Sequence, residues 1–370
     1  MSRARDMADL GAVTARLDTV GGSEGALSNR RLTINGDMTV AQRGSIPAIQ
    51  TGYGACDRFR LASNSAARFD TSQSTDAPSG QGFSKSLKLD CSTADTSVAA
   101  GDYYQLQHMI EGQNLQHLSH GSSSAKQCTL SFWVKSPKTG IHNLEIQHVD
   151  GGVYNIYQYT IASANTWQNV SFTFDGYQTT AIANDNTAGL VIVWWLIGGT
   201  TFSGGSYSEN TCTSSNANRA VGQVNVADST SNDFYLTGVQ LEVGAQETPF
   251  EHRSFGQELA LCQRYYFQMG GEGIYERFAD GFNNSSTQAR CVTHFPVTMR
   301  SAPSVAYTSN LLIVSSASNG DVTSIVADYN NTHMGHVKYN ASGASLTAGQ
   351  GAAIAANNST ATRLKFEAEL

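Results

Sequence analysis

The chain has 370 residues, a length that allows two or three domains, and only 14% of them are Asp, Glu, Lys or Arg, against about 25% in a typical soluble domain. Its formal net charge is -7 and it shows no basic stripe, which excludes nucleic acid as the main partner because phosphate backbones are bound by clustered Lys and Arg. No stretch approaches the roughly 20 apolar residues that span a bilayer, so membrane insertion is excluded as well.

The first element expected is a short amphipathic helix over residues 3–18. Its apolar residues follow a 3-4-3 spacing: Met7, Leu10, Thr14 and Leu17. A helix of about 15 residues is marginal alone in water, so this narrow seam needs a partner. The Met and Leu side chains are therefore candidate attachment or oligomerisation contacts in a short coiled coil, and a frayed terminal helix is the alternative. A Gly-rich link follows, so residues 1–30 are expected to form an attachment segment.

From about residue 31 the pattern becomes β. Strict alternation of apolar and polar residues predicts seven strands, over residues 86–91, 103–110, 129–134, 153–161, 169–174, 190–197 and 234–243. Turns rich in Gly, Ser, Asn and Asp separate them, and no convincing helix interrupts them. This pattern predicts a jelly-roll β-sandwich over residues 31–250.

The pattern of apolar residues changes after residue 250. Apolar residues at helical spacing predict a linking helix near 255–267, with Tyr266 on its apolar face. Short strands return at 289–297, 304–307, 311–314 and 336–339. The predicted fold class is therefore all-β with minor helix, in which a short N-terminal helix, a sandwich, a linking helix and a C-terminal β-rich domain (251–370) follow one another.

The six cysteines stand far apart and show no metal-cluster spacing. Alternation places Cys91, Cys128 and Cys291 among apolar neighbours on their strands. We interpret such cysteines as small core hydrophobes, and disulfide or redox roles are the alternative.

Three stretches resemble one class of protein. The first reads INGDMTVAQRG at 34–44 and continues to YGACDRF at 53–59. The second reads FYLTGVQLEVG at 234–244, with TPFE at 248–251 and LCQRYY at 261–266. The third reads FPVTMRSAP at 295–303. In this order they resemble tail-fibre-like virion proteins of tailed bacteriophages, and the central part, with TLSFWVK at 129–135, is similar to jelly-roll carbohydrate-binding modules.

The resemblance implies a homotrimeric surface appendage of a phage particle, assembled in the host cytoplasm. It implies other virion proteins as partners of the N-terminus and host surface polysaccharide as the receptor. Whether such a subunit sits on the tail or the head, and whether the sandwich or the last hundred residues touches the receptor, stays open.

The sequence contains no motif that indicates a catalytic site. No two carboxylates are paired by spacing, the GxSxG nucleophile motif is absent, and the histidines lack HExxH spacing. We therefore expect no enzyme and no cofactor. Glu242 could be a calcium ligand, a glycan contact or a solvated residue, and we favour the last two.

Residues suited to glycan binding are easier to identify than catalytic ones. On strand 129–134 the apolar residues share one parity, which sends Trp133 to the opposite face, where its ring could stack on a sugar. Beside it we place strand 103–110, where Tyr103, Gln105 and Gln107 share one face. Strand 153–161 adds Tyr157 and Tyr159 to the candidate glycan contacts. Aromatic residues are also enriched in strands by β propensity alone, so Trp133 packed under a loop or against another subunit is the alternative.

The function expected is adhesion of a tail fibre or receptor-binding appendage to a host glycan. Two rivals are kept. A purely structural virion component, such as a head fibre, cement or baseplate piece, predicts that Trp133 is buried between subunits. A glycan depolymerase predicts two carboxylates that face one groove.

Overall fold

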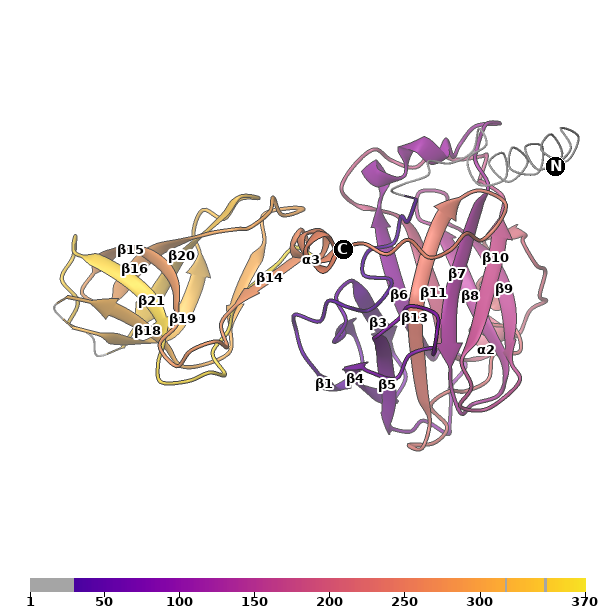
Figure 1. The fold of residues 1–370 in the computed structure, drawn as a ribbon, viewed down its shortest axis with the longest axis horizontal. Helices are drawn as coiled ribbons and strands as arrows, with labels where there is room; N and C mark the ends of the chain where they lie inside the picture. The colour runs from indigo at the N-terminus through magenta and orange to yellow at the C-terminus, as the bar shows by residue number, and fades with distance from the viewer. Residues whose placement is uncertain (1–29, 317, 343–344) are drawn as a thin grey trace, which may run out of the picture. The chain divides into compact units, whose positions relative to one another are not determined.

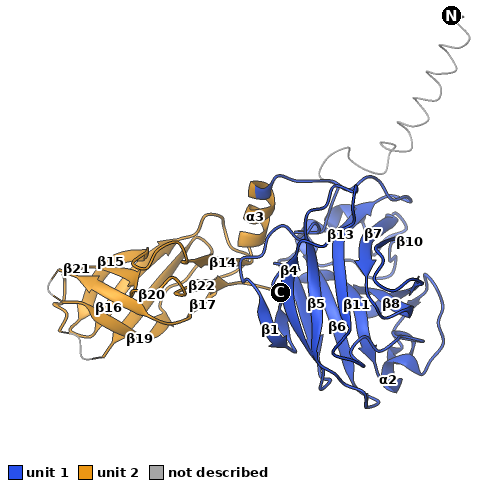
Figure 2. Cartoon of the chain, turned by 60° about the horizontal axis from the view of Figure 1, so that its bottom comes forward, with its two compact units in different colours: residues 1–255 blue, residues 256–370 orange. Residues whose placement is uncertain are grey.

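The structure is a computed structural model, and it describes residues 30–316, 318–342 and 345–370. Two compact units are present, residues 1–255 (unit 1) and 256–370 (unit 2), shown in different colours in Figure 2. The sequence places its boundary slightly earlier, between residues 250 and 251. The predicted contacts Met7, Leu10 and Leu17 lie outside the described residues, so their role stays a prediction.

Unit 1 is a sandwich of two antiparallel sheets (Figure 1). The six-stranded sheet has the spatial order β1 (Ile46–Ile49), β4 (Arg68–Ser74), β5 (Ser86–Thr93), β13 (Asp233–Val243), β7 (Cys128–Lys135) and β10 (Gln168–Phe174). The seven-stranded sheet has the order β12 (Cys212–Thr213), β9 (Val153–Ile161), β8 (Gly140–His148), β11 (Ala188–Gly198), β6 (Tyr103–Glu111), β3 (Phe59–Ser63) and β2 (Gly52–Tyr53). Short helical turns join them, namely η1 (Gly112–Asn114), η2 (Gln116–Leu118), α2 (Thr200–Ser203) and η3 (Asn216–Asn218).

The chain passes repeatedly from one sheet to the other. Strands β5, β7, β10 and β13 belong to the six-stranded sheet, while β6, β8, β9 and β11 belong to the seven-stranded one. This exchange confirms the predicted all-β jelly-roll fold, and each of the seven predicted strands is present. Strand β8 was not predicted, because two of its core-facing positions are His142 and His148, which break the apolar alternation of the sequence.

The core of unit 1 lies between the sheets. On β7 the side chains of Leu130, Phe132 and Val134 are fully buried, as the alternation predicts. The Phe132 ring meets the Trp194 ring of β11 edge-on, with 5.6 Å between centroids. Burial of a side chain of this size contributes about 1.5–3 kcal/mol. The side chains at the alternate positions of each strand therefore lie on the outer face of its sheet.

The stretch NGDM at residues 35–38 is fixed by side-chain hydrogen bonds of Asn35 and by a close backbone contact of Gly36. Asn35 adopts a left-handed conformation with φ 58°, and its side chain bonds to the Val40 amide and carbonyl at 2.9 and 2.8 Å and to the Asp57 carbonyl at 2.9 Å. Gly36 accepts a hydrogen bond from the Val239 amide, so close that a Cβ on Gly36 would lie 2.0 Å from the Val239 carbonyl oxygen. Two of the recognisable stretches of the sequence thus contact each other in the fold.

Unit 2 contains a small sheet and a closed barrel. Helix α3 (Phe255–Gln263) precedes the sheet β14 (Tyr266–Met269), β22 (Leu364–Glu367) and β17 (Ser304–Tyr307). The barrel has the order β15 (Arg277–Ser285), β16 (Gln288–His294), β20 (Met334–Ala341), β19 (Gly320–Ala327), β18 (Leu311–Ser315) and β21 (Gly351–Ala356). The predicted helix was too long: Tyr266 is the first residue of β14 and is buried there, paired with Glu367.

All six cysteines are free, and five of them are buried. Cys91, Cys128 and Cys291 pack in apolar clusters, which confirms their interpretation as core residues. Cys212 is the exposed exception, and its thiol contacts the Asn155 side-chain oxygen. Within the described part of the chain, no helix combines the length and the apolar character that crossing a membrane requires.

Candidate functional site

The residues predicted to form one aromatic platform lie on two different sheets. Tyr103, Gln105 and Gln107 project from the outer face of β6 in the seven-stranded sheet, whereas Trp133 projects from the outer face of β7 in the six-stranded sheet. The prediction that Trp133 lies beside the β6 residues is therefore wrong. Periodicity assigns a side chain to a face of its strand, but it does not say which sheet the strand joins.

Two further predicted contacts are corrected. Tyr157 and Tyr159 of β9 are 1% and 6% exposed and belong to the core between the sheets. Tyr157 donates its hydroxyl to Asn210, and the Tyr159 ring stacks on the His142 ring at 5.4 Å. Both parities of β9 carry aromatic and amide residues, so its sequence does not tell the core face from the outer face.

The β6 residues line a cavity of about 330 Å³, here called the β6 cavity. Its lining comes from β3, β6, β8 and the chain segments around β2 and after β11: Thr51, Arg60, Ala62, Ser63, Tyr103, Gln105, Gln107, Gln147, Phe202 and Arg219. Of the predicted site residues, the structure brings these three together: Tyr103, Gln105 and Gln107.

A chain of hydrogen bonds crosses the floor of the β6 cavity. Arg60 on β3 lies opposite Gln107 on β6, and its Nη1 donates to Gln107 Oε1 at 3.0 Å. Gln107 Nε2 in turn donates to Gln105 Oε1 at 2.8 Å. Antiparallel pairing of β3 with β6 places Arg60 and Gln107 directly across from each other, and the period of two along β6 sets Gln105 beside Gln107.

Aromatic rings form one wall of the cavity. Phe202, in α2, meets the Tyr103 ring edge-on with centroids 5.7 Å apart and an interplanar angle of 76°. Its ring also packs on Trp195 of β11 at 5.3 Å. Trp195 is fully buried and lies across from Gln105 in the β11–β6 ladder. A small apolar cluster on the outer face of the sheet thus holds Tyr103 in place.

A buried ion pair lies beside this wall. The Arg219 guanidinium donates two hydrogen bonds to the Glu145 carboxylate, at 2.7 and 2.8 Å, and Glu145 also accepts the Trp195 indole N–H at 3.3 Å. Arg219 covers the Tyr154 ring at 4.0 Å. Burial has the largest effect on the pKa of Glu145 and raises it, while the bonds from Arg219 and Trp195 act in the opposite direction.

Trp133 lines a separate cavity, also about 330 Å³, here called the Trp133 cavity. Its other lining residues are Gln81, Phe83, Ser131, Asn169, Gly238, Glu247, Pro249, Phe250 and His252. The Phe83 and Phe250 rings meet edge-on at 5.0 Å, and Asn169 donates to both oxygens of Glu247 at 2.9 and 3.1 Å. Trp133 is half-buried in this setting, so its outward direction is as predicted and its role as a contact stays a prediction.

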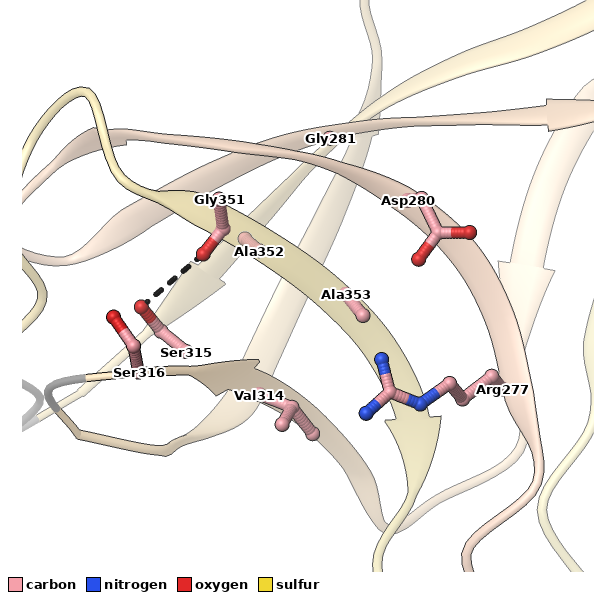
Figure 3. Close-up of a pocket in the computed structure, with 9 residues that line it drawn as sticks. All are labelled: Arg277, Asp280, Gly281, Val314, Ser315, Ser316, Gly351, Ala352 and Ala353. Carbon is pink, nitrogen blue, oxygen red and sulfur yellow. Dashed lines mark hydrogen bonds between the residues drawn. The ribbon is translucent and has the colours of Figure 1, made fainter.

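Unit 2 carries a third hollow, of about 530 Å³, over the outer side of β15, β18 and β21 (Figure 3). Arg277 and Asp280 stand on β15 beside the small residues of β21. Ser315 donates to the Gly351 carbonyl at 3.3 Å. No residue of this hollow was predicted as a contact, and it has no aromatic side chain among its lining residues.

Glu242 differs from its prediction as a solvated residue. It is 2% exposed, and its oxygens accept bonds from the Gln240 amide and from the amide and hydroxyl of Thr248, at 2.6–2.9 Å. Its carboxylate therefore anchors the chain that leaves β13. Among the described residues, no group of three His, Cys, Asp or Glu side chains is placed to hold a metal ion.

Sequence reasoning missed three residues of the β6 cavity that its chemistry needs, Arg60, Phe202 and Arg219. Arg60 could have been found from the alternation on 59–63, where Phe59 and Leu61 take the core parity and send Arg60 outward. Phe202 and Arg219 come from the long connection between β11 and β13, and no local pattern indicates which sheet that connection covers.

The sequence matches no protein-family model and no curated protein. Solved structures of similar shape include the enzymatically active domain of tailspike protein 4 of bacteriophage CBA120, at 15% identity and TM-score 0.29, covering 50% of this chain. The match spans only 19% of the length of that solved tailspike chain. A second match is the family 11 carbohydrate-binding module of Clostridium thermocellum Lic26A-Cel5E, at 14% identity and TM-score 0.28, covering 55% of this chain and 97% of that one. A third is TmCBM61 in complex with β-1,4-galactotriose, at 9% identity and TM-score 0.26, covering 50% of this chain and 88% of that one. Because each TM-score is below 0.5, the fold assignment rests on the strand order and register of this chain.

Proposed function

We propose that this chain binds a glycan and that its binding site is the β6 cavity. The observation that carries the proposal is the meeting of an aromatic wall with a polar floor. Tyr103 and Phe202 offer apolar ring surface, and Arg60, Gln107 and Gln105 offer a row of hydrogen-bonding groups beside it. A sugar presents the same two surfaces, an apolar ring face and a rim of hydroxyls.

The cavity is also preorganised. Gln105 in the lining is 4% exposed and Trp195 behind it is fully buried, so both are fixed by packing and by the ladder between β6 and β11. Side chains that are already held in place lose little conformational freedom when a ligand binds. A partly polar cavity of about 330 Å³ suits weak, specific contact with one or two sugar rings.

We propose binding without cleavage. Glycoside hydrolysis commonly uses two carboxyl groups about 5–9.5 Å apart, and the lining of the β6 cavity contains neither Asp nor Glu. The Glu145 carboxylate, which binds the lining residue Arg219, already accepts hydrogen bonds from Arg219 and Trp195. These observations favour an adhesive role over the depolymerase alternative.

The place of action is proposed to be a phage particle, with this chain as a tail-fibre or receptor-binding subunit. The support is the sequence resemblance across residues 34–303. A homotrimer would present three copies of a weak site to a repetitive polysaccharide, and avidity of this kind can raise overall affinity by about 10²–10⁴.

The experiment is an array of bacterial surface polysaccharides probed with the full-length protein, with reducing ends measured on every glycan that binds. We expect saturable binding to a subset of glycans and no new reducing ends. Gln107→Ala should weaken binding about three- to tenfold, because it removes hydrogen bonds from the floor. Gln246→Ala, at an exposed position outside the cavity, is the matched control and should leave binding unchanged.

Either of two results would contradict the proposal. Folded protein that binds no glycan on the array, and no intact host cell, would leave a structural virion component as the better account. New reducing ends on a bound glycan would make the protein an enzyme.

A further inference from the structure

We propose that the β6 cavity selects glycans that carry a carboxylate, as hexuronic acids do, and that Arg60 binds this group. The inference rests on the proposed function and names the class of sugar. It follows from the charges of the cavity and from the direction of the hydrogen bonds across its floor.

The charges of the lining oppose the charge of the chain. The whole sequence carries a formal charge of -7, yet the two charged side chains that line the β6 cavity are both arginines, Arg60 and Arg219. A cavity with positive groups and no carboxylate attracts an anionic ligand locally, while the rest of the surface does not. Non-specific attraction of polyanions to this protein is therefore weak, which makes a local preference measurable.

The two arginines differ in how far they are already occupied. The Arg219 guanidinium is bound through two nitrogens to the buried Glu145 carboxylate, so its charge is largely compensated. Arg60 is half-buried, and in the described part of the chain its side chain makes a single hydrogen bond, from Nη1 to Gln107. A guanidinium has five N–H donors, so Arg60 retains donors for a ligand.

The direction of the floor bonds fixes which atoms remain for the ligand. Arginine has no acceptor, so the atom of Gln107 that meets Arg60 must be its oxygen. The Gln107 nitrogen then faces Gln105, and the Gln105 oxygen accepts from it. Each amide oxygen of the row thus already accepts one bond within the protein, and the N–H groups left over are donors, on Arg60 at one end, on Gln107, and on the Gln105 amide at the other.

A ligand that matches this floor must bring acceptors. Sugar hydroxyls can serve, but a carboxylate is the stronger match, since charge-assisted bonds to a guanidinium are roughly twice as strong as neutral ones and can be bidentate. Tyr103 and Phe202 then contact the apolar ring of the same sugar. We therefore expect a sugar acid to bind at least about tenfold more tightly than the matched neutral sugar.

The test compares acidic polysaccharides with their carboxyl-reduced forms. Alginate, polygalacturonate, hyaluronate and the host surface polysaccharide are each used intact and after chemical reduction of the carboxylates, and binding of the full-length protein is measured at low and high salt. We expect at least one acidic glycan to bind, its reduced form to bind at least about tenfold more weakly, and the difference to shrink as the salt concentration rises.

Variants locate the effect. Arg60→Gln should remove the preference for the acidic form while binding of the reduced form stays within about twofold, and Arg60→Lys should restore part of it. Arg277→Gln, the same substitution in unit 2, is the control and should change nothing. Equal affinity for acidic and reduced forms, or an equal loss in Arg277→Gln, would overturn the inference and leave glycan binding intact. Absence of binding to every glycan would instead remove the proposed function itself.

Discussion

Arg219 and Glu145 join the connection between β11 and β13 to the middle of the seven-stranded sheet. Arg219 precedes Ala220, whose amide donates to the Phe202 carbonyl at 2.8 Å. The ion pair therefore fixes the backbone that carries Phe202, and with it the aromatic wall of the β6 cavity. Glu145 is fully buried, so its charge depends on this partner.

Removal of Arg219 should destabilise unit 1. Arg219→Ala leaves the Glu145 carboxylate buried without its cation, which typically costs about 3–5 kcal/mol. The double variant Arg219→Met with Glu145→Leu removes both charges and should be less destabilised than Arg219→Ala. Denaturant unfolding of the three proteins measures this. Equal free energies of unfolding for wild type and Arg219→Ala would show that the pair does not hold the connection.

The alternation of apolar and polar residues predicts which side chains of most strands face the core. It does not predict which strands pair with each other, and this explains the residues that were assigned to the wrong place. Parity predicts correctly that Tyr103 and Gln107 point outward, because three of the residues at the intervening positions of β6 are apolar and buried, namely Tyr104, Leu106 and Ile110. On β9 both parities are mixed, so Tyr157 was placed outward although it packs in the core. The pairing of sheets depends on contacts between distant segments, so neither the separation of Trp133 from Tyr103 nor the arrival of Phe202 was readable from the sequence.

The recognisable stretch around Gly36 should be intolerant of a side chain. Gly36→Ala would place a Cβ about 2.0 Å from the Val239 carbonyl, so the backbone must shift and the hydrogen bond between these residues weakens. We expect a loss of about 1–3 kcal/mol in the free energy of unfolding. Gly44→Ala tests the opposite case: no atom lies near its Cβ position, although its φ of 68° adds some strain. A Gly36→Ala protein as stable as wild type would contradict the close approach.

Acid should destabilise unit 1 through its buried histidines, of which His120 and His148 form a pair. The His120 and His148 rings lie 5.3 Å apart; burial lowers the pKa of His120 to about 4, and burial with the neighbouring His120 lowers the pKa of His148 to about 3. The ordinary value is 6.5, so between pH 6.5 and these values the unfolded chain binds more protons than the folded one. The stability is therefore complete above pH 6.5 and is lost progressively as the pH falls.

His148→Phe tests this dependence. An uncharged ring at this position removes one of the histidine titrations, so the free energy of unfolding should fall less steeply between pH 7 and pH 4. Gln246→Ala, an uncharged substitution at an exposed position, is the control and should keep the wild-type slope. Denaturant midpoints across this range give the slopes, and identical slopes for wild type and His148→Phe would show that other groups control acid sensitivity.

The central claim is that the β6 cavity holds the glycan, and the two faces of the sandwich allow a direct test. Affinity for a glycan bound by the wild-type protein is measured for Tyr103→Ala and for Trp133→Ala, with folding of both checked by thermal unfolding. If the β6 cavity is the glycan site, Tyr103→Ala should bind at least about tenfold more weakly than wild type, and the affinity of Trp133→Ala should stay within about twofold of wild type. The reverse result, with loss in Trp133→Ala alone, would contradict the claim and place the site in the Trp133 cavity.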